Sequence, residues 1–455
     1  MFRQKEENKE FYRNLRKLVI PITLQNLLYS AVGASDAIML GFLNQDSLSA
    51  VSLATQVSFV LSLFYGALTG GATILAAQYW GKRDTRTVEK ILAIAMRYAI
   101  IISLVFTIAG FTCPKLIMRL FTSDSALIEI GAEYIQVASI SYLLASISQV
   151  YLSIMKTCDR VVMSTIIGAM AVVLNLILNA IFIFGLLGFP ALGAAGAALA
   201  TDIAIGTEVV CIIVILIRKT SITLRFRYMF SRMGIIHKDF IRYSLPVLGN
   251  QLAWGGGITM YSVIMGHLGT DATAANSVAT IGRNICASLC WGLGAGSGIL
   301  VGNKLGRNDL EGAKRDGSRL CRIALIIGVG SGLVLLALTP IITGVINLSD
   351  TANGYLKWML VINSYYIIGN SINSTVIAGI FYAGGDSRFG MICDAINMWL
   401  VILPCGFLAA FVLKLPVLAI SVILSMDEFT KMPIIYRHYK KYKWIKNITR
   451  EKELV

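Results

Sequence analysis

Long apolar stretches alternate with short polar ones along this chain of 455 residues. Twelve of the stretches hold roughly 20 residues or more, the length that a helix needs to cross about 30 Å of hydrocarbon. Their approximate bounds are 16–41, 50–79, 91–112, 127–153, 161–185, 191–217, 240–267, 275–303, 318–346, 356–381, 388–413 and 415–436. The pattern therefore predicts an all-α integral membrane protein with twelve transmembrane helices.

The composition and the distribution of charge extend this prediction. Only 14% of the residues are charged, whereas about a quarter of a soluble domain is charged. The net charge is +15, and if the N-terminus is cytoplasmic, 35 of the 40 Lys and Arg residues fall in inner segments. This positive-inside bias predicts a multi-pass protein of the plasma membrane with both termini in the cytoplasm. We expect the basic tail to contact anionic lipid of the bilayer, and we expect no nucleic-acid partner.

The chain contains one long stretch twice. Residues 21–84 align with residues 246–309 at a constant offset of 225, so that Gly41 meets Gly266 and Asp84 meets Asp309. The second copy starts six helices after the first, so both copies start on the same side of the membrane and form parallel repeats. The predicted organisation is a six-helix lobe over residues 1–217, a basic cytoplasmic linker over 218–240, and a second six-helix lobe with a basic tail over 241–455.

Sequence features of enzymes are missing. Gly294, Gly298, Gly302 and Gly306 recur every four residues, a spacing that favours close helix packing in membranes over phosphate binding. No GxxxxGK[ST] motif accompanies them. None of the three histidines lies deep in an apolar stretch, and the eight cysteines form no CxxC pair. We therefore expect neither an enzyme nor a cofactor.

Ionisable side chains within the apolar stretches are functional candidates, because burying them in hydrocarbon is costly. They are Asp36, Asp202, Glu208, Arg283, Asp394, Asp427 and Glu428. In the first half, Asp36, Asn179 and Thr201 lie about 5, 6 and 10 residues from the outer ends of their helices. Asn175 is one turn from Asn179, and Asp202 adjoins Thr201. This group of oxygens suits H⁺ or Na⁺, and a hydrogen-bonded packing network is the alternative interpretation.

The second half carries a different set. Arg283 lies about 9 residues inside its helix, and Asp427 and Glu428 lie about 12 residues inside the last one. Arg283 could form a buried ion pair with these carboxylates, or it could extend toward the outer surface. We predict a possible second polar network of these three residues, and we interpret Asp394, near an inner helix end, as structural.

Several motifs together resemble those of the multidrug and toxic compound extrusion (MATE) family of cation-coupled antiporters. They are the helix with Pro21 and Asp36, the paired endings AAQYWGKRD and VGNKLGRND, the inner loops with Asp159-Arg160 and GGDSR, and the segments LNLILNAIFIFG and GFPALGAAGAALAT. The resemblance covers nearly the whole chain. It implies two lobes arranged in a V, of the MATE/MOP type, which export organic and often cationic compounds while H⁺ or Na⁺ enters.

The resemblance also implies a cation site. The DinF-like branch has an Asp on helix one, an Asn and an Asp on helix five, and a Thr on helix six, which correspond to Asp36, Asn175, Asn179 and Thr201. Asn179 replaces the second acid here, and Asp202 is a possible substitute, although adjacent helical residues point about 100° apart. The NorM-like branch has an acid on helix seven, where this chain has NQLAWGGGI. The chain therefore looks closer to the DinF-like branch.

These observations lead to one functional hypothesis. The chain is a secondary antiporter in which Asp36 binds H⁺ or Na⁺ and thereby changes the packing of helix one, with Pro21 as a hinge or only as a tolerated first-turn proline. A Na⁺ ion at Asp36 is the one metal considered. A lipid-linked precursor flippase of related fold and a membrane-embedded enzyme are the alternatives. The sequence leaves open the small organic substrate, the coupling ion and the oligomeric state.

Overall fold

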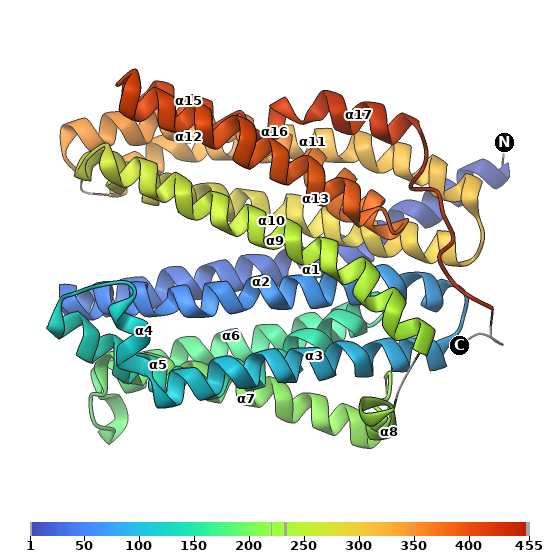
Figure 1. Cartoon of the computed structure of the whole chain (residues 1–455), viewed down its shortest axis with the longest axis horizontal. Helices are drawn as coiled ribbons and strands as arrows, with labels where there is room; N and C mark the ends of the chain where they lie inside the picture. The colour runs from blue at the N-terminus through green and yellow to red at the C-terminus, as the bar shows by residue number, and fades with distance from the viewer. Residues whose placement is uncertain (1, 220, 232–233, 347, 452–455) are drawn as a thin grey trace. The chain divides into compact units, whose positions relative to one another are not determined.

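The computed structural model describes residues 2–219, 221–231, 234–346 and 348–451, and within these ranges the regular structure is entirely helical. The helices are α1 (Phe2–Leu43), α2 (Gln45–Gly81), α3 (Thr85–Thr112), α4 (Pro114–Arg119), α5 (Ser125–Thr157), α6 (Val161–Phe184), η1 (Leu186–Gly188), α7 (Gly193–Arg218), α8 (Phe226–Phe230), α9 (Gly234–His267), α10 (Thr270–Gly306), α11 (Leu310–Val345), α12 (Asp350–Asn373), η2 (Ser374–Phe381), α13 (Ser387–Ile396), η3 (Asn397–Ile402), α14 (Leu403–Phe407), η4 (Leu408–Val412), α15 (Val417–Ser425), α16 (Asp427–Thr430) and α17 (Met432–Lys440). Figure 1 labels most of the α-helices and colours the chain from blue at the N-terminus to red at the C-terminus.

The predicted apolar stretches all correspond to helices. Among the described residues, nine continuous helical segments are long and apolar enough to cross a membrane, and α13 through η4 form one of them. The three remaining predicted spans are occupied by α9, by α12 continued through η2, and by the consecutive short helices α15, α16 and α17. The prediction of an all-helical membrane protein is confirmed.

The chain divides into two compact units. Unit 1 contains the described parts of residues 1–26, 73–84 and 242–451, and unit 2 contains residues 27–72 and the described parts of 85–241. The helices α1 and α2 thus contribute to both units. Residues 220, 232 and 233 of the predicted linker lie outside the described residues, and its short helix α8 belongs to unit 2.

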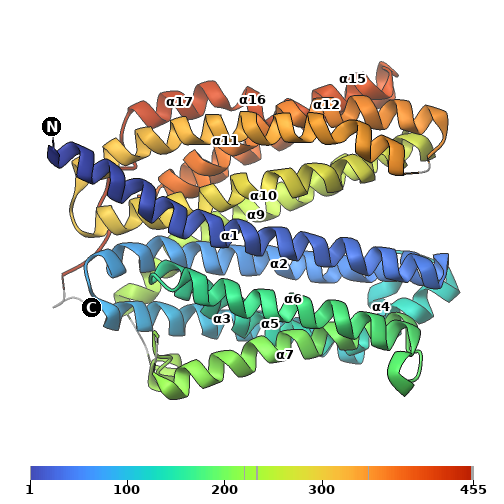
Figure 2. The same ribbon diagram turned by 180° about the vertical axis from the view of Figure 1, so that it is seen from behind.

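Unit 2 is a bundle in which α5 packs against α3 and α7, and α6 packs along α7 (Figure 2). Its core includes Leu61, Ile135 and Ala198. The absence of a side chain at Gly196 allows α6 and α7 to approach, since a Cβ there would lie 2.6 Å from the carbonyl oxygen of Phe182. This close contact fixes the position of the Asn175 and Asn179 side chains of α6 relative to α7.

Unit 1 is built around α10, which packs against α11, α12 and η2. The glycine stripe of α10 makes this contact, as predicted. A Cβ at Gly294 would lie 3.0 Å from the carbonyl oxygen of Ser374, and a Cβ at Gly379 would lie 2.8 Å from that of Gly294. Small residues on both helices therefore bring the two backbones together where no hydrophobic force would do so in lipid.

The segment 441–451, which we call the tail strap, is tightly packed in unit 1. The side chain of Trp444 is 0% exposed, and its carbonyl lies against Gly384. Gln78, also 0% exposed, donates to the carbonyl oxygens of Ala383 and Lys446 over 2.7 and 3.0 Å and accepts from the backbone N–H of Ile448 over 2.8 Å. The strap thus joins the end of α2 to the loop after η2.

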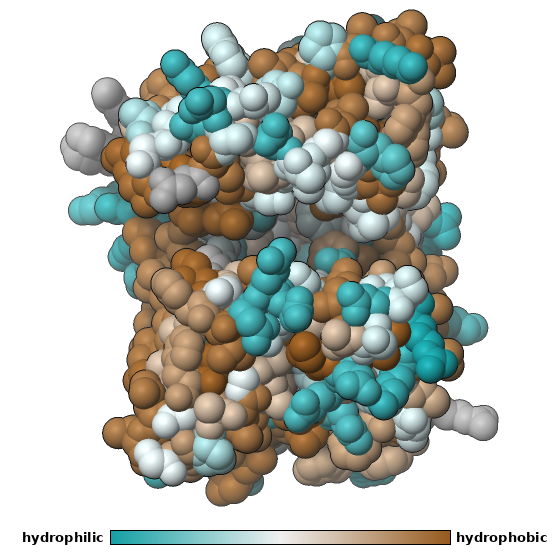
Figure 3. Space-filling view, turned by 90° about the vertical axis from the view of Figure 1, so that its left-hand side faces the viewer, coloured by the Kyte–Doolittle hydropathy of each residue, from teal (hydrophilic) through white to brown (hydrophobic). Residues whose placement is uncertain are grey.

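The surface agrees with burial in a bilayer. Viewed toward one end of the helices, hydrophilic side chains form patches on the exposed end, and hydrophobic residues are frequent around its edge (Figure 3). Large apolar side chains such as Ile101, Val105 and Ile108 on α3 and Ile326 and Leu333 on α11 are exposed. Exposed apolar residues in continuous rows mark surfaces that contact lipid rather than water.

Candidate cation site and buried charge cluster

Three helices of unit 2 bring four predicted site residues into one hydrogen-bonded chain. The amide Nδ2 of Asn179 donates to Asp36 Oδ1 over 2.5 Å and to Asn175 Oδ1 over 3.1 Å. The amide of Asn175 then donates to Thr201 Oγ1 over 3.2 Å, and that hydroxyl donates to the carbonyl oxygen of Ala197 over 3.0 Å. We call the series Asp36–Asn179–Asn175–Thr201 the polar chain.

The two asparagines are buried and the two end members are partly exposed. Asn175 and Asn179 lie one turn apart on the buried face of α6, whereas Asp36 and Thr201 are half-buried. Within the described part of the chain, Asn179 Oδ1 is a buried oxygen with no hydrogen-bond partner. An orphaned acceptor beside a single carboxylate leaves the polar chain with capacity for one more donor or for a cation.

Among the described residues, no group of three or more His, Cys, Asp or Glu side chains is arranged to hold a metal ion. The polar chain offers one carboxylate and several neutral oxygens. Hard, weakly bound ions such as Na⁺ accept oxygen ligands of this kind, and a proton needs only the carboxylate itself. The chemistry of the residues therefore fits a monovalent exchangeable cation.

Asp202 lies apart from the polar chain. Its Oδ1 accepts a hydrogen bond of 2.9 Å from the backbone N–H of Ser141 on α5, and its Oδ2 is buried without a partner in the described structure. The side chain points to α5 because it is one residue, or about 100°, from Thr201 on α7. The structure therefore brings together Asp36, Asn175, Asn179 and Thr201, and not Asp202.

A cavity of about 450 Å³ adjoins the polar chain in unit 2. Thr201 lines it, so one end of the polar chain reaches the cavity wall. The other lining residues come from α1, α2, α5 and α7 and include Tyr29, Ser58, Tyr65, Thr69, Ser141, Tyr142 and Gln149. A cavity of this volume, with aromatic and hydroxyl side chains, has the size and character of a site for a small organic molecule.

Glu208 is a further buried carboxylate to which the sequence analysis gave no role. Its side chain on α7 accepts hydrogen bonds from Ser148 on α5 and, over 3.5 Å, from the hydroxyl of Tyr29 on α1. Both partners are far away in the sequence, so no local spacing signals their contact. Its position in an apolar stretch was the only available signal.

Pro21 lies within α1, which is helical from Phe2 to Leu43. Its ring nitrogen cannot donate the bond that an ordinary residue would make to the carbonyl oxygen of Lys17. Pro21 falls in the part of α1 that belongs to unit 1, five residues before the boundary after Asn26. The hinge role stays a prediction.

A second set of charges is buried in unit 1. The ammonium of Lys431 lies 3.0 Å from Asp394, 3.7 Å from Asp427 and 3.1 Å from Glu428. The three carboxylates surround one lysine at the break between α16 and α17. We call Lys431 and these three acids the lysine cluster.

Asparagine side chains donate further hydrogen bonds to the three carboxylates of the lysine cluster. Asn250 donates to Asp394 over 2.6 Å, Asn397 donates to Asp427 over 2.8 Å, and Asn373 donates to Glu428 over 2.7 Å. Two of these amides also donate to backbone carbonyls: Asn397 to that of Asp427 and Asn373 to that of Glu428. Amide groups thereby satisfy backbone acceptors that an unbroken helix would have satisfied itself.

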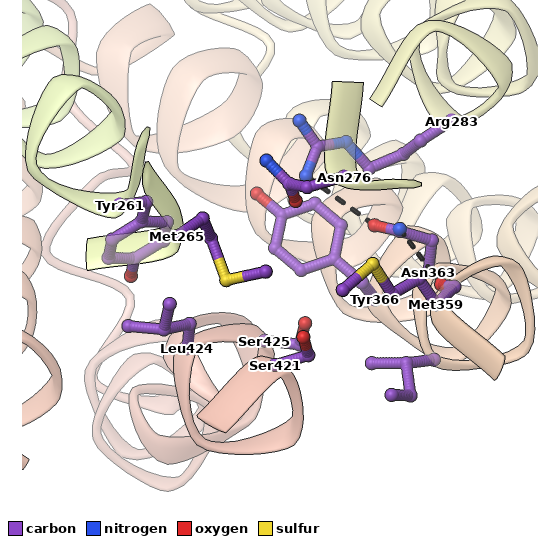
Figure 4. A pocket seen from close by; sticks show the side chains of 11 residues that line it. Tyr261, Met265, Asn276, Arg283, Met359, Asn363, Tyr366, Ser421, Leu424 and Ser425 are labelled. Atoms are coloured by element: carbon purple, nitrogen blue, oxygen red, sulfur yellow. Dashed lines mark hydrogen bonds between the residues drawn. The ribbon is translucent and has the colours of Figure 1, made fainter. Parts of the chain in front are cut away.

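Arg283 is not the partner of these acids. Its guanidinium donates to Asn363 Oδ1 over 3.5 Å and lies 5.0 Å from the centre of the Tyr366 ring. Figure 4 shows it beside Asn276 and Tyr366, with Ser421 and Ser425 across the pocket. This pocket holds only about 40 Å³. Of the two interpretations of Arg283, the ion pair with Asp427 or Glu428 is therefore not formed, because these two acids and Asp394 pair with Lys431.

The sequence contained a signal for Lys431. It follows Asp427 by four residues and Glu428 by three, the two spacings at which helical side chains meet. Lys431 is one of the 35 Lys and Arg residues that the charge distribution places in inner segments. Its ion pairs to Asp427 and Glu428 show that it lies inside unit 1.

Membrane-length helices, a buried polar chain and an adjoining cavity are together typical of one class of protein, the membrane transporters. The MatE family model matches residues 21–181 and 247–408, together more than half of the chain. The chain belongs to the MatE family, the multidrug and toxic compound extrusion transporters. The two matches fall on the two repeats that the sequence predicts.

Bacterial relatives match along nearly their full length. The uncharacterized transporter YisQ of Bacillus subtilis is 22% identical over 446 residues, which cover 97% of this chain and 96% of that protein. The probable multidrug resistance protein NorM of Thermotoga maritima is 23% identical over 458 residues, which cover 98% and 97%. Membership in this family makes the chain a transporter and not an enzyme.

Solved structures show the same fold. A MOP superfamily transporter from Pyrococcus furiosus has a TM-score of 0.86 at 17% identity, covering 94% of this chain and 95% of that one. The MATE transporter VcmN of Vibrio cholerae in its bent form has a TM-score of 0.84 at 16% identity, covering 96% and 98%. The predicted MATE/MOP fold class is confirmed.

Proposed function

We propose that the protein is a secondary active antiporter that exports organic, often cationic, compounds in exchange for H⁺ or Na⁺. It lies in the plasma membrane with both termini in the cytoplasm. The observation that carries the proposal is the polar chain of unit 2, which connects the carboxylate of Asp36 to the wall of a cavity of about 450 Å³. The place of Asp36 on α1 also agrees with a cation site in the DinF-like position, and Asn179 stands where that pattern has its second acid.

The hydrogen bonds suggest how cation binding acts on the site. Charged Asp36 accepts from the amide of Asn179, whereas protonated Asp36 has a proton to donate. The unpartnered Oδ1 of Asn179 is an acceptor for that proton. Protonation would therefore turn the Asn179 amide and rearrange the bonds to Asn175 and Thr201, which changes the cavity wall.

A membrane potential supplies enough energy for this cycle. Each positive charge that enters across 100 mV releases about 2.3 kcal/mol. One inward cation could therefore drive a neutral compound outward against roughly a fiftyfold concentration gradient. Coupling requires that the empty carboxylate and the cation-bound carboxylate favour different packings of α1.

The pocket beside Arg283 argues against a lipid-linked precursor flippase. A flippase would need a cationic surface large enough for a pyrophosphate group. The pocket of Arg283 holds about 40 Å³, close to the volume of one water molecule. The larger cavity of unit 2 is lined by tyrosines, serines, threonines, one glutamine and four apolar residues, and its lining contains no Lys or Arg.

Counter-transport in proteoliposomes tests the proposal. We expect the purified protein to move ethidium outward when an inward pH or Na⁺ gradient is imposed, and the effective gradient identifies the coupling ion. The Asp36→Asn variant should lose at least tenfold in rate. Asp46→Asn, an exposed acid at the start of α2, should export at the wild-type rate. Full export by Asp36→Asn would overturn the assignment of the coupling site.

A further inference from the structure

The interface between α5 and α7 holds a second titratable site that the polar chain does not include. Glu208 is 3% exposed, and its carboxylate receives hydrogen bonds from the hydroxyls of Ser148 and Tyr29. Both donors stabilise the charged form of the side chain. A buried carboxylate with two hydroxyl donors is arranged to exchange protons through them, because a hydroxyl can accept one proton while it donates another.

Tyr29 connects Glu208 to the cavity. Its hydroxyl bonds to Glu208, and its side chain also lines the cavity that Thr201 reaches from the polar chain. The cavity has room for several water molecules at about 30 Å³ each. Two hydrogen-bonded routes therefore lead to the same cavity. The polar chain joins Asp36 to Thr201, and a direct bond joins Glu208 to Tyr29.

The remaining groups continue this line along α5. Ser141, whose backbone N–H bonds to Asp202, and Ser148, whose hydroxyl bonds to Glu208, lie seven residues or about 10 Å apart. Lys156 follows Ser148 by eight residues, near the end of α5 at Thr157, and acts electrostatically on Glu208. The acids and the lysine thus follow one helix interface from the cavity toward the inner end.

Hydroxyl and charged groups on α1 and α5 face the two acids of α7, Asp202 and Glu208. Glu208 faces Tyr29 from α1 and Ser148 and Lys156 from α5. Asp202 faces Ser141. The charge of Asp202 also acts electrostatically on Tyr134 and Tyr142 of α5. Asp202 Oδ2 is buried and has no partner in the described structure, so it has capacity for a proton or a water molecule.

We propose that Glu208 is a second proton-binding carboxylate, which passes protons between the cavity and the cytoplasmic end of the α5–α7 interface. A proton that reaches the cavity is carried there by water as hydronium. Tyr29 accepts a proton from the cavity and gives its own hydroxyl proton to Glu208, which later releases it past Lys156 to the cytoplasm. The inference rests on the proposed antiport and adds the inner half of the proton path.

Three variants separate a proton-relay role from a packing role. Glu208→Gln keeps the size of the side chain and one acceptor oxygen for a hydroxyl, but its amide nitrogen donates where the second carboxylate oxygen accepted, and it binds no proton. Glu208→Asp keeps the carboxyl group. Glu133→Gln makes the same chemical change at an exposed position on α5. Each full-length variant is compared with the wild type in proteoliposomes under a pH gradient.

We expect Glu208→Gln to lower pH-driven ethidium export at least tenfold, with unchanged thermal melting and unchanged ethidium binding at equilibrium. Glu208→Asp should restore at least a third of the rate, and Glu133→Gln should match the wild type. Export by Glu208→Gln at the wild-type rate would overturn the proposal.

Infrared difference spectra between acidic and alkaline pH give a readout that does not need transport. We expect Glu208→Gln to lose one carboxylic-acid C=O band and Asp36→Asn to lose a different one. Loss of export with an unchanged C=O spectrum would assign Glu208 a packing role and contradict the relay. If the wild type exports no ethidium under any gradient, the antiport proposal fails while the spectra still decide whether Glu208 binds a proton.

Discussion

The amide of Asn179 lies 2.5 Å from the carboxylate of Asp36 and donates a hydrogen bond to it. The same amide group also donates to Asn175, so the Asn179 side chain links the Asp36 carboxylate on α1 to Asn175 on α6. A substitution at Asn179 therefore removes both the donor to the charged acid and the connection to Thr201.

We predict that Asn179→Ala lowers gradient-driven ethidium export tenfold or more. The substitution leaves Asp36 without its amide donor, and losing a hydrogen bond to a buried charged group costs about 1–3 kcal/mol. The rate in proteoliposomes and the melting temperature of the purified protein measure the two effects. Asn44→Ala, which removes only the cap at the start of α2, is the control and should keep its transport rate. Wild-type export by Asn179→Ala would show that coupling does not pass through this amide.

Among the charged residues, we expect substitution of Lys431 to lower the stability of the folded protein the most. Lys431→Met leaves Asp394, Asp427 and Glu428 buried together without a cation, and breaking a buried ion pair on one side costs about 3–5 kcal/mol. We expect a large fall in melting temperature and in the yield of folded protein. The matched change Lys441→Met, at an exposed lysine, should leave the melting temperature unchanged.

A double variant distinguishes charge from packing at the same position. Lys431→Met combined with Asp427→Asn removes one of the uncompensated carboxylates and should recover part of the lost melting temperature. If the double variant melts no higher than Lys431→Met, the destabilisation comes from lost packing and not from unpaired charge.

The tail strap should be required for a stable unit 1. Trp444→Ala removes a fully buried ring that packs against Gly317 and Tyr439. Truncating a large buried aromatic side chain costs about 3–5 kcal/mol. We expect a lower melting temperature and faster proteolysis after residue 440, measured by mass spectrometry of the fragments. Lys443→Ala, on the exposed side of the strap, should behave like the wild type, and equal stability of both variants would refute a structural role for Trp444.

The sequence allowed the helices and much of the candidate site to be predicted because both depend on local spacing. Apolar runs of membrane length marked the helices. Asn175 and Asn179, four residues apart, had to share a face of α6, and depth estimates placed Asp36 and Thr201 near them. Asp202, a candidate for the same site, lies apart from it, because its neighbour Thr201 takes the face toward Asn175.

The features that were missed depend on contacts between distant segments. Tyr29 and Glu208 are 179 residues apart in the sequence, and no periodicity relates them. The charge distribution counts Lys431 among the basic residues of the inner segments, and hydropathy alone does not show that three carboxylates surround this lysine. The cavity of unit 2 arises from side chains of four helices, so it could not be read from any one of them.

The contact between Gln78 and the tail strap has a consequence for biosynthesis. Gln78 bonds to the backbone of Ile448, 370 residues later in the chain. Until the ribosome has synthesised residue 448, the buried amide of Gln78 lacks the acceptor on Lys446 and the donor on Ile448. Gly384 and Gly317 likewise have no Trp444 to pack against until that residue is made. Unit 1 can therefore be completed only late in translation, and any chain that stops short of this point exposes polar groups that membrane quality control can recognise.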